Sequence, residues 1–506
     1  MDLVVLMWGG VVFFIMVMAY LGYRGLKHTR SLTDYTIARG MAPPWAVGLC
    51  YAGTYCSAGT FMGLVGFSYA WGMPVLWFEM SNWFFAAMVL VLVAKGFLRM
   101  GAMRRSLSLP DWLGDRYNSD AIRVVGAVLS FFLIFYIVGQ FAGLSYLWEI
   151  LLGIPYKWGL LITAVVVVGY VVSGGTYADI WTDVVQVILM MVVALCIFLS
   201  IWFLFPEGFA DMTARLTSID PVLTSKLNKE ALLFSSPVAI IAIFCTHMIF
   251  GTNPGLSNKI LALRRERDVA SFILFAAAAL CVLNLVVFGG LYARALGLPV
   301  ERPDHATAVL LKESFPALLG ALFGVAILAA SMSTTDGLFI VISTIFSNDL
   351  FRKTLVKRDI IKYDDAAKLD RHALLVGRTT TVLVGVVCVL LALKPPEYIV
   401  VLMVTGAFFS GSGAFGPIIL GIWWRRTTPT GALLGMLCGA GCYLALYLAK
   451  IEPNVFLAGA IGGGVSLTVT AVASLLTRPL PEPFVQALFA RTEEIERVGL
   501  SPHPEG

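Results

Sequence analysis

Three apolar stretches of this sequence are interrupted by residues that could bind an ion or a polar solute. They are Gly53-Thr54-Tyr55-Cys56-Ser57-Ala58-Gly59-Thr60, Thr246-His247 with Gly251-Thr252-Asn253-Pro254-Gly255, and Ser331-Met332-Ser333-Thr334-Thr335-Asp336. Hydroxyls and free carbonyls are hard oxygen donors of the kind that Na⁺ prefers, and no soft ligand set accompanies them. Ser331 and Thr335 could instead bond their own helix backbone. That alternative does not cover Asp336, because a carboxylate inside an apolar segment is costly unless it serves a ligand.

The first two interruptions break segments that otherwise read as regular membrane helices. Unpaired backbone groups are costly in hydrocarbon, so such breaks survive where they line a cavity or bind a ligand. For either break alone, packing glycines at helix contacts are the alternative explanation. Paired breaks at corresponding positions of two repeats instead point to a transport site near the membrane midplane.

The composition requires that lipid surrounds most of the chain. Of the 506 residues, 59% are hydrophobic and only 13% are charged, whereas a soluble domain carries about 25% charged residues. Apolar runs of about 20 residues, each long enough to cross a bilayer, recur along the whole sequence. The eight cysteines all lie in apolar segments without metal-site spacing, so we expect buried small side chains and no metal site beyond sodium.

Hydropathy predicts an all-α integral membrane protein with thirteen transmembrane helices. The predicted spans are roughly 3–22, 45–71, 75–98, 122–150, 155–173, 181–205, 234–254, 271–292, 316–346, 373–393, 398–424, 428–449 and 455–477. Residues 1–477 thus form one transporter domain, and 478–506 form a cytoplasmic C-terminal tail.

The spans divide into two sets of five. The core covers about residues 45–424, with one repeat over 45–205 and the other over 234–424. Five is odd, so the second repeat runs through the membrane in the opposite direction. Each of the two breaks falls in the first helix of its repeat, which predicts a binding site between them.

The positive charges set the orientation. Of the 36 Lys and Arg residues, 27 lie in one set of loops and nine in the other. Cytoplasmic loops carry the excess, so we predict an external N-terminus and a cytoplasmic C-terminus in a bacterial inner (plasma) membrane. The absence of Asn-x-Ser/Thr sequons agrees with a bacterial membrane.

Four motifs, in the same order, make the chain resemble the sodium:solute symporter family. They are Gly174-Gly175 with Ala178-Asp179-Ile180-Trp181-Thr182-Asp183 and Gln186, Leu109-Pro110-Asp111-Trp112-Leu113, Ala329-Ala330-Ser331-Met332-Ser333-Thr334, and Ala414-Phe415-Gly416-Pro417. The resemblance covers about residues 1–477. It implies a leucine-transporter-type (LeuT-type) 5+5 inverted-repeat fold and alternating access driven by inward Na⁺ as the coupling ion, without an organic cofactor.

The resemblance also implies an ion site. Carried over by position, the sodium ligands are the carbonyls of Gly53, Cys56 and Ala330 and the hydroxyls of Ser333 and Thr334. Asp183 matches a family aspartate that guides Na⁺ toward the cytoplasm and helps form a second sodium site in some members.

The second site departs from the family pattern. Where hydroxyls are expected one helical turn past the first site, this chain has Asp336 and Gly337. Asp183 and Asp336 could together strengthen a second cation site, or one of them could hold a proton, since neighbouring like charges raise one pKa.

The same resemblance places the substrate between the two breaks. Candidate substrate residues are Tyr55, Ser57, Thr60, Glu79, Tyr136, Gln140, Thr246 and His247. Tyr136 and Gln140 are four residues apart and share one helix face. Glu79 could bond a substrate hydroxyl or amine, or pair structurally. His247 could donate to a carboxylate or simply pack.

The substrate prediction favours a small monocarboxylate or pantothenate-like acid, with proline or another amino acid as the alternative. Helix N-terminal amides exposed at the first break would suit a carboxylate, and no Arg lies in mid-span. Lys394-Pro395-Pro396-Glu397 and the aromatic residues after it resemble pantothenate carriers.

Other function classes fit less well. A channel needs a continuous pore, a transporter-like sensor needs a longer cytoplasmic region, and an enzyme needs a nucleophile with a base or a metal cluster, whereas the five histidines are not paired within a span. We therefore predict a monomeric carrier without enzymatic activity. Its partners are a small-molecule substrate, Na⁺ and the bilayer, and no nucleic acid.

Overall fold

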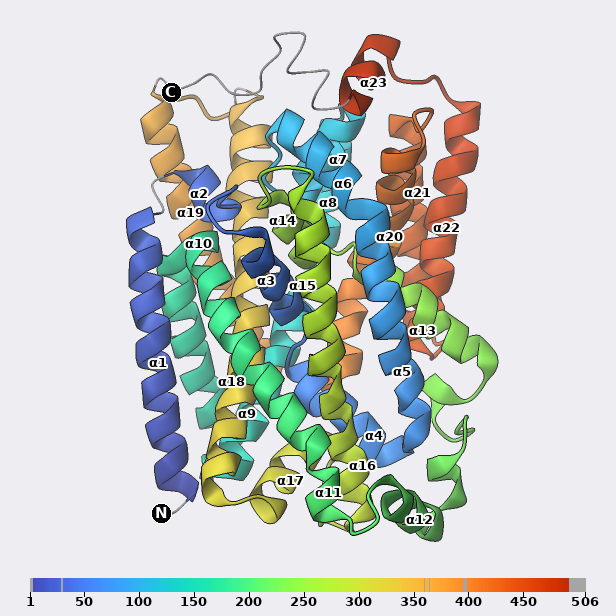
Figure 1. Ribbon diagram of the computed structural model, residues 1–506. Coiled ribbons are helices and arrows are strands. Elements are labelled where there is room, and N and C mark those ends of the chain that lie inside the picture. Colours follow the sequence, from blue (N-terminus) through green and yellow to red (C-terminus); the bar gives the residue numbers. More distant parts are fainter. Residues whose placement is uncertain (1–2, 29–30, 359, 364, 395–397, 491–506) are drawn as a thin grey trace.

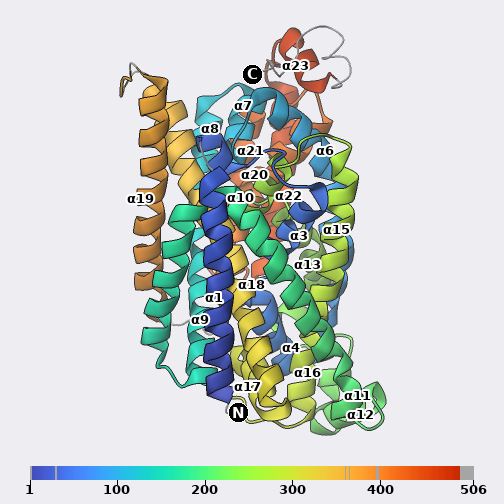
Figure 2. The ribbon, with the colours of Figure 1, turned by 60° about the vertical axis from the view of Figure 1, so that its left-hand side comes forward.

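The computed structural model describes residues 3–28, 31–358, 360–363, 365–394 and 398–490, and all regular elements within these ranges are helices. The predicted run at 395–397 and the end of the tail, 491–506, lie outside the described residues. Most helices run roughly parallel to one long axis (Figures 1 and 2). α1 (Leu3–His28) stands at one edge of the bundle, followed by the short α2 (Leu32–Thr36).

The predicted first repeat, residues 45–205, begins with a helix in two halves. Its helices are α3 (Pro44–Tyr55), α4 (Val65–Trp71), α5 (Leu76–Ser81), α6 (Ala87–Arg104), α7 (Leu109–Tyr117), α8 (Asp120–Phe131), α9 (Ile134–Leu152) and α10 (Tyr156–Leu199). α10 contains a kink at Gly175, whose φ of 64° and ψ of 178° are not helical. A left-handed φ suits glycine, since it has no Cβ to clash. The kink separates the predicted spans 155–173 and 181–205.

α11 (Ile201–Leu204) and α12 (Phe209–Ile219) follow. The range predicted for the second repeat, residues 234–424, contains α13 (Pro237–Phe250), α14 (Pro254–Leu261), α15 (Asp268–Leu283), α16 (Phe288–Ala295), α17 (Ala306–Ser314), α18 (Ala317–Thr344), α19 (Ala366–Ala392) and α20 (Ile399–Trp423). After it come α21 (Pro429–Leu448), α22 (Val455–Leu476) and the short α23 (Glu482–Phe489). α23 adds helix to a tail that we expected to be mostly exposed.

Short π and 3₁₀ segments join several of these helices. The π segments are η1 (Gly59–Leu64), η3 (Asn82–Ala86) and η8 (Ile345–Val356). The 3₁₀ segments are η2 (Met73–Val75), η4 (Pro221–Thr224), η5 (Leu232–Phe234), η6 (Asn284–Val287) and η7 (Pro303–His305). π turns are frequent at functional sites, and η1 and η3 both border the pocket described below.

The structure describes ten helices long and apolar enough to cross a membrane, or eleven if α13 and α14 count as one bent span. The segments 44–71 and 156–169 consist of shorter helices. The multi-pass helical membrane fold is thus confirmed, and the count of thirteen stays a prediction. The start of α1 and the short α23 lie at opposite ends of the bundle (Figure 1), as an odd number of crossings requires.

The bundle exposes many large apolar side chains on its outer surface, as a protein surrounded by lipid does. Three cysteines, Cys245, Cys281 and Cys438, also lie exposed, so the expectation that every cysteine is buried is wrong for them. A cysteine in an apolar segment can face lipid as readily as the core, because hydrocarbon is no worse a solvent for it than the protein interior.

Both predicted breaks are present, and they lie in the middle of the bundle. α3 ends at Tyr55, and Cys56 has extended backbone angles before the chain coils again at Gly59. α13 and α14 meet at a bend of 44°. α3 packs against α10, α15 and α18, so the first break lies against the hydroxyl-rich part of α18.

Candidate functional site

Four of the five proposed sodium ligands meet where α18 touches the end of α3. The Ser333 hydroxyl donates to the carbonyl of Gly53 at 3.0 Å and of Ala330 at 3.1 Å. The Thr334 hydroxyl lies 3.3 Å from the same two carbonyls and from that of Thr54. Both side chains are buried. An ion here would replace hydroxyl–carbonyl hydrogen bonds by ion–oxygen contacts, so this group, the hydroxyl–carbonyl cage, has the donor set of a Na⁺ site.

A pocket opens beside the first break. The lining residues are Tyr55, Ser57, Gly59, Thr60, Leu64, Phe78, Asn82, Tyr136, Thr246, His247, Phe250, Val400, Met403, Val404, Phe408 and Phe456. The empty space between them amounts to about 470 Å³, which includes space open to solvent. Six predicted substrate residues line it, whereas Glu79 and Gln140 do not.

The backbone amides at the first break are already hydrogen-bonded. The N–H of Ser57 donates to the Thr60 hydroxyl, and that of Ala58 to the Gln140 side-chain oxygen, at 3.3 and 3.1 Å. The N–H of Gly59 donates to the Ser57 hydroxyl at 3.0 Å. The expectation that these amides are open to a substrate carboxylate is therefore wrong, because side chains cap this helix start as in soluble proteins.

The Gln140 side chain makes hydrogen bonds within the protein and does not line the pocket. Its Oε1 accepts hydrogen bonds from the Ala58 N–H and from the Ser331 hydroxyl, the latter at 2.9 Å. Gln140 thus ties the broken helix to α18. Thr335 bonds its own helix backbone, as the alternative explanation from the sequence proposed. Its hydroxyl donates to the Ser331 carbonyl at 2.5 Å.

His247 presents an acceptor and not a donor. Its Nδ1 lies 2.8 Å from the Ile243 carbonyl and 2.9 Å from the Ser81 hydroxyl. A carbonyl only accepts, so Nδ1 carries the proton, and Nε2 of the neutral ring is the acceptor. Thr246 donates to the carbonyls of Ala242 and Ile243 at 2.9 Å and is satisfied by its own helix.

Glu79 is buried, and neither of its carboxylate oxygens makes a hydrogen bond of normal geometry, although the Asn82 side-chain amide lies close enough to act on it. Asn82, three residues later on the same helix face, lines the pocket, and its Oδ1 accepts the Tyr55 hydroxyl at 2.9 Å. Sequence reasoning missed Asn82, although its spacing from Glu79 was the available signal.

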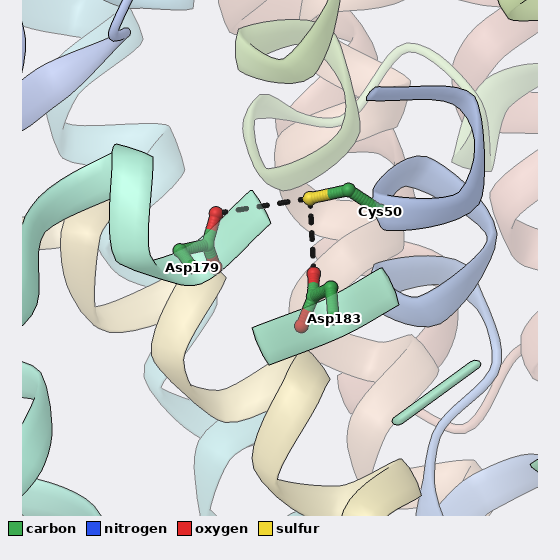
Figure 3. A group of neighbouring side chains, drawn as sticks. All are labelled: Cys50, Asp179 and Asp183. Atoms are coloured by element: carbon green, nitrogen blue, oxygen red, sulfur yellow. Dashed lines mark hydrogen bonds between the residues drawn. The ribbon is translucent and has the colours of Figure 1, made fainter. Parts of the chain in front are cut away.

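A buried charged cluster lies next to the cage, since a Cβ atom built at Gly53 would be 3.6 Å from Ser333 Cβ and 3.7 Å from Asp183 Cγ. The Cys50 thiol donates to Asp183 Oδ2 at 3.0 Å and lies 3.8 Å from Asp179 Oδ2 (Figure 3). The Lys259 ammonium pairs directly with Asp179 and lies 3.7 Å from Asp183 Oδ2. We call Cys50, Asp179, Asp183 and Lys259 the Lys259 cluster.

Sequence reasoning missed Lys259, counting it among the loop charges, whereas it is a buried residue of α14. The described contacts of Asp183 are thus to a thiol and an ammonium. Asp336 is also buried, and its Oδ1 accepts the Gly337 N–H at 2.9 Å.

A second charged network closes the end of the bundle where α7 meets η8. Arg123 pairs with Asp111 at 3.2 Å and with Asp115 at 3.0 Å, and Lys353 pairs with Asp111 at 2.6 Å. Burial and the neighbouring Asp111 raise the pKa of Asp115. Asp111 belongs to the Leu-Pro-acidic motif, so that motif holds two helix ends together.

Curated relatives of this chain include proline carriers. The osmoregulated proline transporter OpuE of Bacillus subtilis is 26% identical, over 91% of this chain and 93% of its own length. The high-affinity proline transporter PutP of the same organism is 27% identical, over 84% and 88%. Sodium/proline symporter 2 of Staphylococcus saprophyticus is 25% identical, over 88% and 86%.

Solved structures share the fold. A Na⁺-coupled sialic acid symporter in a substrate-bound, outward-open state is 18% identical, with a TM-score of 0.76 over 94% of this chain and 99% of its own. A nucleobase-cation-symport-1 family transporter is 13% identical, with a TM-score of 0.53 over 90% and 97%. The sequence model of one family matches residues 35–439, which include both breaks and the hydroxyl-rich helix α18. This chain therefore belongs to the sodium:solute symporter family.

Proposed function

We propose that this protein is a sodium-coupled symporter that imports a small zwitterionic amino acid, with proline as the first candidate. The observation that carries the proposal is the buried Glu79 carboxylate, which makes no hydrogen bond of normal geometry, has no cation beside it among the described residues, and lies one helical turn from the pocket residue Asn82. An unpaired buried charge is costly, and a substrate amine would compensate it. The named relatives transport proline, which favours the amino-acid alternative over the monocarboxylate.

The pocket offers different partners to the two ends of a zwitterion. Glu79 and the acceptor nitrogen of His247 suit the amine. The carboxylate is left with the Asn82 amide and the hydroxyls of Tyr136 and Ser57, which lie 3.3 Å from one another. Apolar side chains complete the lining, and a pyrrolidine ring needs such a surface. They are Leu64, Phe78, Phe250, Val400, Met403, Val404, Phe408 and Phe456.

Sodium binding at the hydroxyl–carbonyl cage explains how an ion stabilises the substrate site. The cage carbonyls of Gly53 and Thr54 directly precede Tyr55 and Ser57, which line the pocket. We propose Gly53, Cys56, Ala330, Ser333 and Thr334 as the ligands. An ion at the cage would fix the backbone of the break and with it these substrate contacts, so each ligand would raise the affinity for the other.

The remaining features of the carrier are also proposals. The chain has thirteen spans with a 5+5 inverted repeat over 45–205 and 234–424, an external N-terminus and a cytoplasmic C-terminus. A monomer suffices, and Na⁺ leaves toward the cytoplasm past Asp183 and Asp336. The pocket then lies in the outer half of the protein, because Val400 and Phe456 begin helices that enter from outside.

Uptake into proteoliposomes tests the function. Radiolabelled proline should accumulate when an inward Na⁺ gradient is imposed and should not accumulate with K⁺ alone. Excess unlabelled proline should abolish the signal, whereas pyruvate, acetate, propionate and pantothenate should leave it unchanged. Competition by the monocarboxylates without competition by proline would overturn the amino-acid proposal and restore the carboxylate alternative.

The net charge moved across the membrane with each solute molecule is a second, independent measurement. A zwitterion moves the full charge of its sodium ions, whereas a monocarboxylate cancels one of them. The ratio of electrical current to labelled solute should therefore equal the number of sodium ions for proline. A ratio lower by one charge for the transported solute would identify an acid.

A further inference from the structure

We propose that the ammonium group of Lys259 is a built-in cation that replaces a second transported sodium ion, so that this carrier binds and moves one Na⁺ in each cycle. The inference rests on the proposed sodium coupling. It goes beyond that coupling, because it gives the number of transported ions and the residue that sets this number.

The first observation is where the ammonium lies. Lys259 is a residue of α14 with a side chain only 5% exposed, and its partners Asp179 and Asp183 on α10 are 2% and 0% exposed. A buried ammonium and a buried carboxylate are both costly unless they compensate each other. Lys259 thus takes the position next to Asp183 that a second free cation would need.

The second observation is the net charge of the Lys259 cluster. Two carboxylates in contact with one ammonium leave one negative charge, and Oδ1 of each aspartate has no hydrogen-bond partner. The hydroxyl–carbonyl cage, by contrast, has only neutral ligands. One sodium ion in the cage would therefore balance the charge of the Lys259 cluster.

The third observation is that a single glycine separates the two positions. A Cβ atom built at Gly53 would lie 3.6 Å from Ser333 Cβ in the cage and 3.7 Å from Asp183 Cγ in the cluster. Both side chains thus lie next to one backbone position, and the attraction between opposite charges is stronger in a buried site than in water. The negative charge of the Lys259 cluster can therefore attract a Na⁺ ion in the cage, whose own ligands are neutral.

The fourth observation concerns the space one turn beyond the cage. Gly337 has no side chain, and a Cβ built there would lie 3.5 Å from both Lys259 Nζ and Thr54 Oγ1. The ammonium thus reaches the helix turn that follows Ser333 and Thr334. Two positive charges in this buried region would repel each other strongly, which leaves no place for a second Na⁺.

The experiment counts sodium ions on purified full-length protein by saturation binding of ²²Na⁺. The wild type should bind one ion per chain. Lys259→Met should bind two, because both aspartates then need mobile cations, and Na⁺-dependent proline uptake by this variant should become sigmoidal in Na⁺. Lys259→Met combined with Asp179→Asn should return to one ion, because one carboxylate is then left for one cation.

Lys259→Arg, which keeps the charge, is the matched control and should bind one ion. Two ions on the wild type, or one ion on correctly folded Lys259→Met, would overturn the inference and leave sodium coupling intact. If Lys259→Met fails to fold, the wild-type count alone decides. One bound ion without proline transport would overturn the proposed substrate and leave the inference standing, whereas no saturable ²²Na⁺ binding would overturn the sodium coupling and the inference with it.

Discussion

At the residue scale, the site consists of side chains whose partners are backbone carbonyls and buried carboxylates. The hydroxyls of Ser333 and Thr334 are the clearest case, since both point at carbonyls of another helix. Most other hydroxyls of α18 donate only to their own helix, as a membrane helix requires. A hydroxyl that donates to a carbonyl of another helix is thus a candidate Na⁺ ligand, whereas a hydroxyl that donates only to its own helix is not.

Removing both hydroxyls should weaken sodium binding. We expect Ser333→Ala with Thr334→Ala to raise the Na⁺ concentration for half-maximal proline uptake by about tenfold or more, because each lost ligand costs about 1–3 kcal/mol. Ser343→Ala with Thr344→Ala is the control, since these hydroxyls of the same helix donate only to the Ile340 carbonyl. Equal Na⁺ dependence in the two double variants would contradict the proposed ion site.

Glu79 distinguishes the substrate classes. Glu79→Gln should lower proline uptake by about tenfold to a hundredfold, mainly through a higher KM, because the amine loses a charge-assisted hydrogen bond. Glu149→Gln removes the same charge from an exposed position on α9 and should leave uptake unchanged. Uptake by Glu79→Gln at the wild-type KM would show that Glu79 pairs within the protein.

At the element scale, contacts between helix ends hold one end of the bundle together. α7 binds η8 through Asp111 and Lys353, and its first residue Leu109 donates to the Asn258 side chain of α14 at 3.1 Å. These contacts join elements of the two predicted repeats, at the end of the bundle that we propose faces the cytoplasm. In the alternating access that we propose, they would separate when that end opens.

Weakening this contact should favour the state open to the cytoplasm. We expect Lys353→Met to increase labelling of Cys50 by a membrane-permeant maleimide severalfold, since Cys50 is fully buried in the closed arrangement. Mass spectrometry of the Cys50 peptide would measure it. Lys362→Met, which removes an exposed lysine nearby, should have no effect. Unchanged labelling in Lys353→Met would show that this network does not hold the gate.

At the scale of the whole molecule, stability depends on contacts between distant elements that bury polar groups. Asp304 in η7 is one example, since its Oδ2 accepts the N–H of Ile399 at the start of α20 at 3.0 Å. Burial raises the pKa of this carboxyl to about 7. The folded protein therefore keeps a proton on Asp304 that the unfolded chain releases near its ordinary pKa of about 4.

This difference predicts a pH dependence of stability. Between about pH 4 and 7 the folded state binds more protons than the unfolded state, so stability falls with rising pH, by at most about 1.4 kcal/mol per pH unit, and levels off above 7. Melting temperatures in detergent should fall from pH 5 to pH 7 in the wild type and fall less in Asp304→Asn, which keeps an oxygen acceptor for Ile399. Parallel curves for the two proteins would contradict the assignment.

The membrane class, the two breaks and the family can be read from the sequence alone, and the sequence also named four residues that meet in the hydroxyl–carbonyl cage. Apolar length, glycine-rich interruptions and motif order are local signals, because they depend on which residues follow one another. The family resemblance implied eight substrate candidates, and six of them line the pocket.

Which polar groups already have hydrogen-bond partners depends on the tertiary structure. The Ala58 amide and the Gln140 side chain look available in the sequence, but partners distant in the chain occupy them. Lys259 reads as a loop charge until α14 folds it against α10. Hydrogen bonds and ion pairs between elements depend on three-dimensional neighbours, and a linear pattern does not contain them.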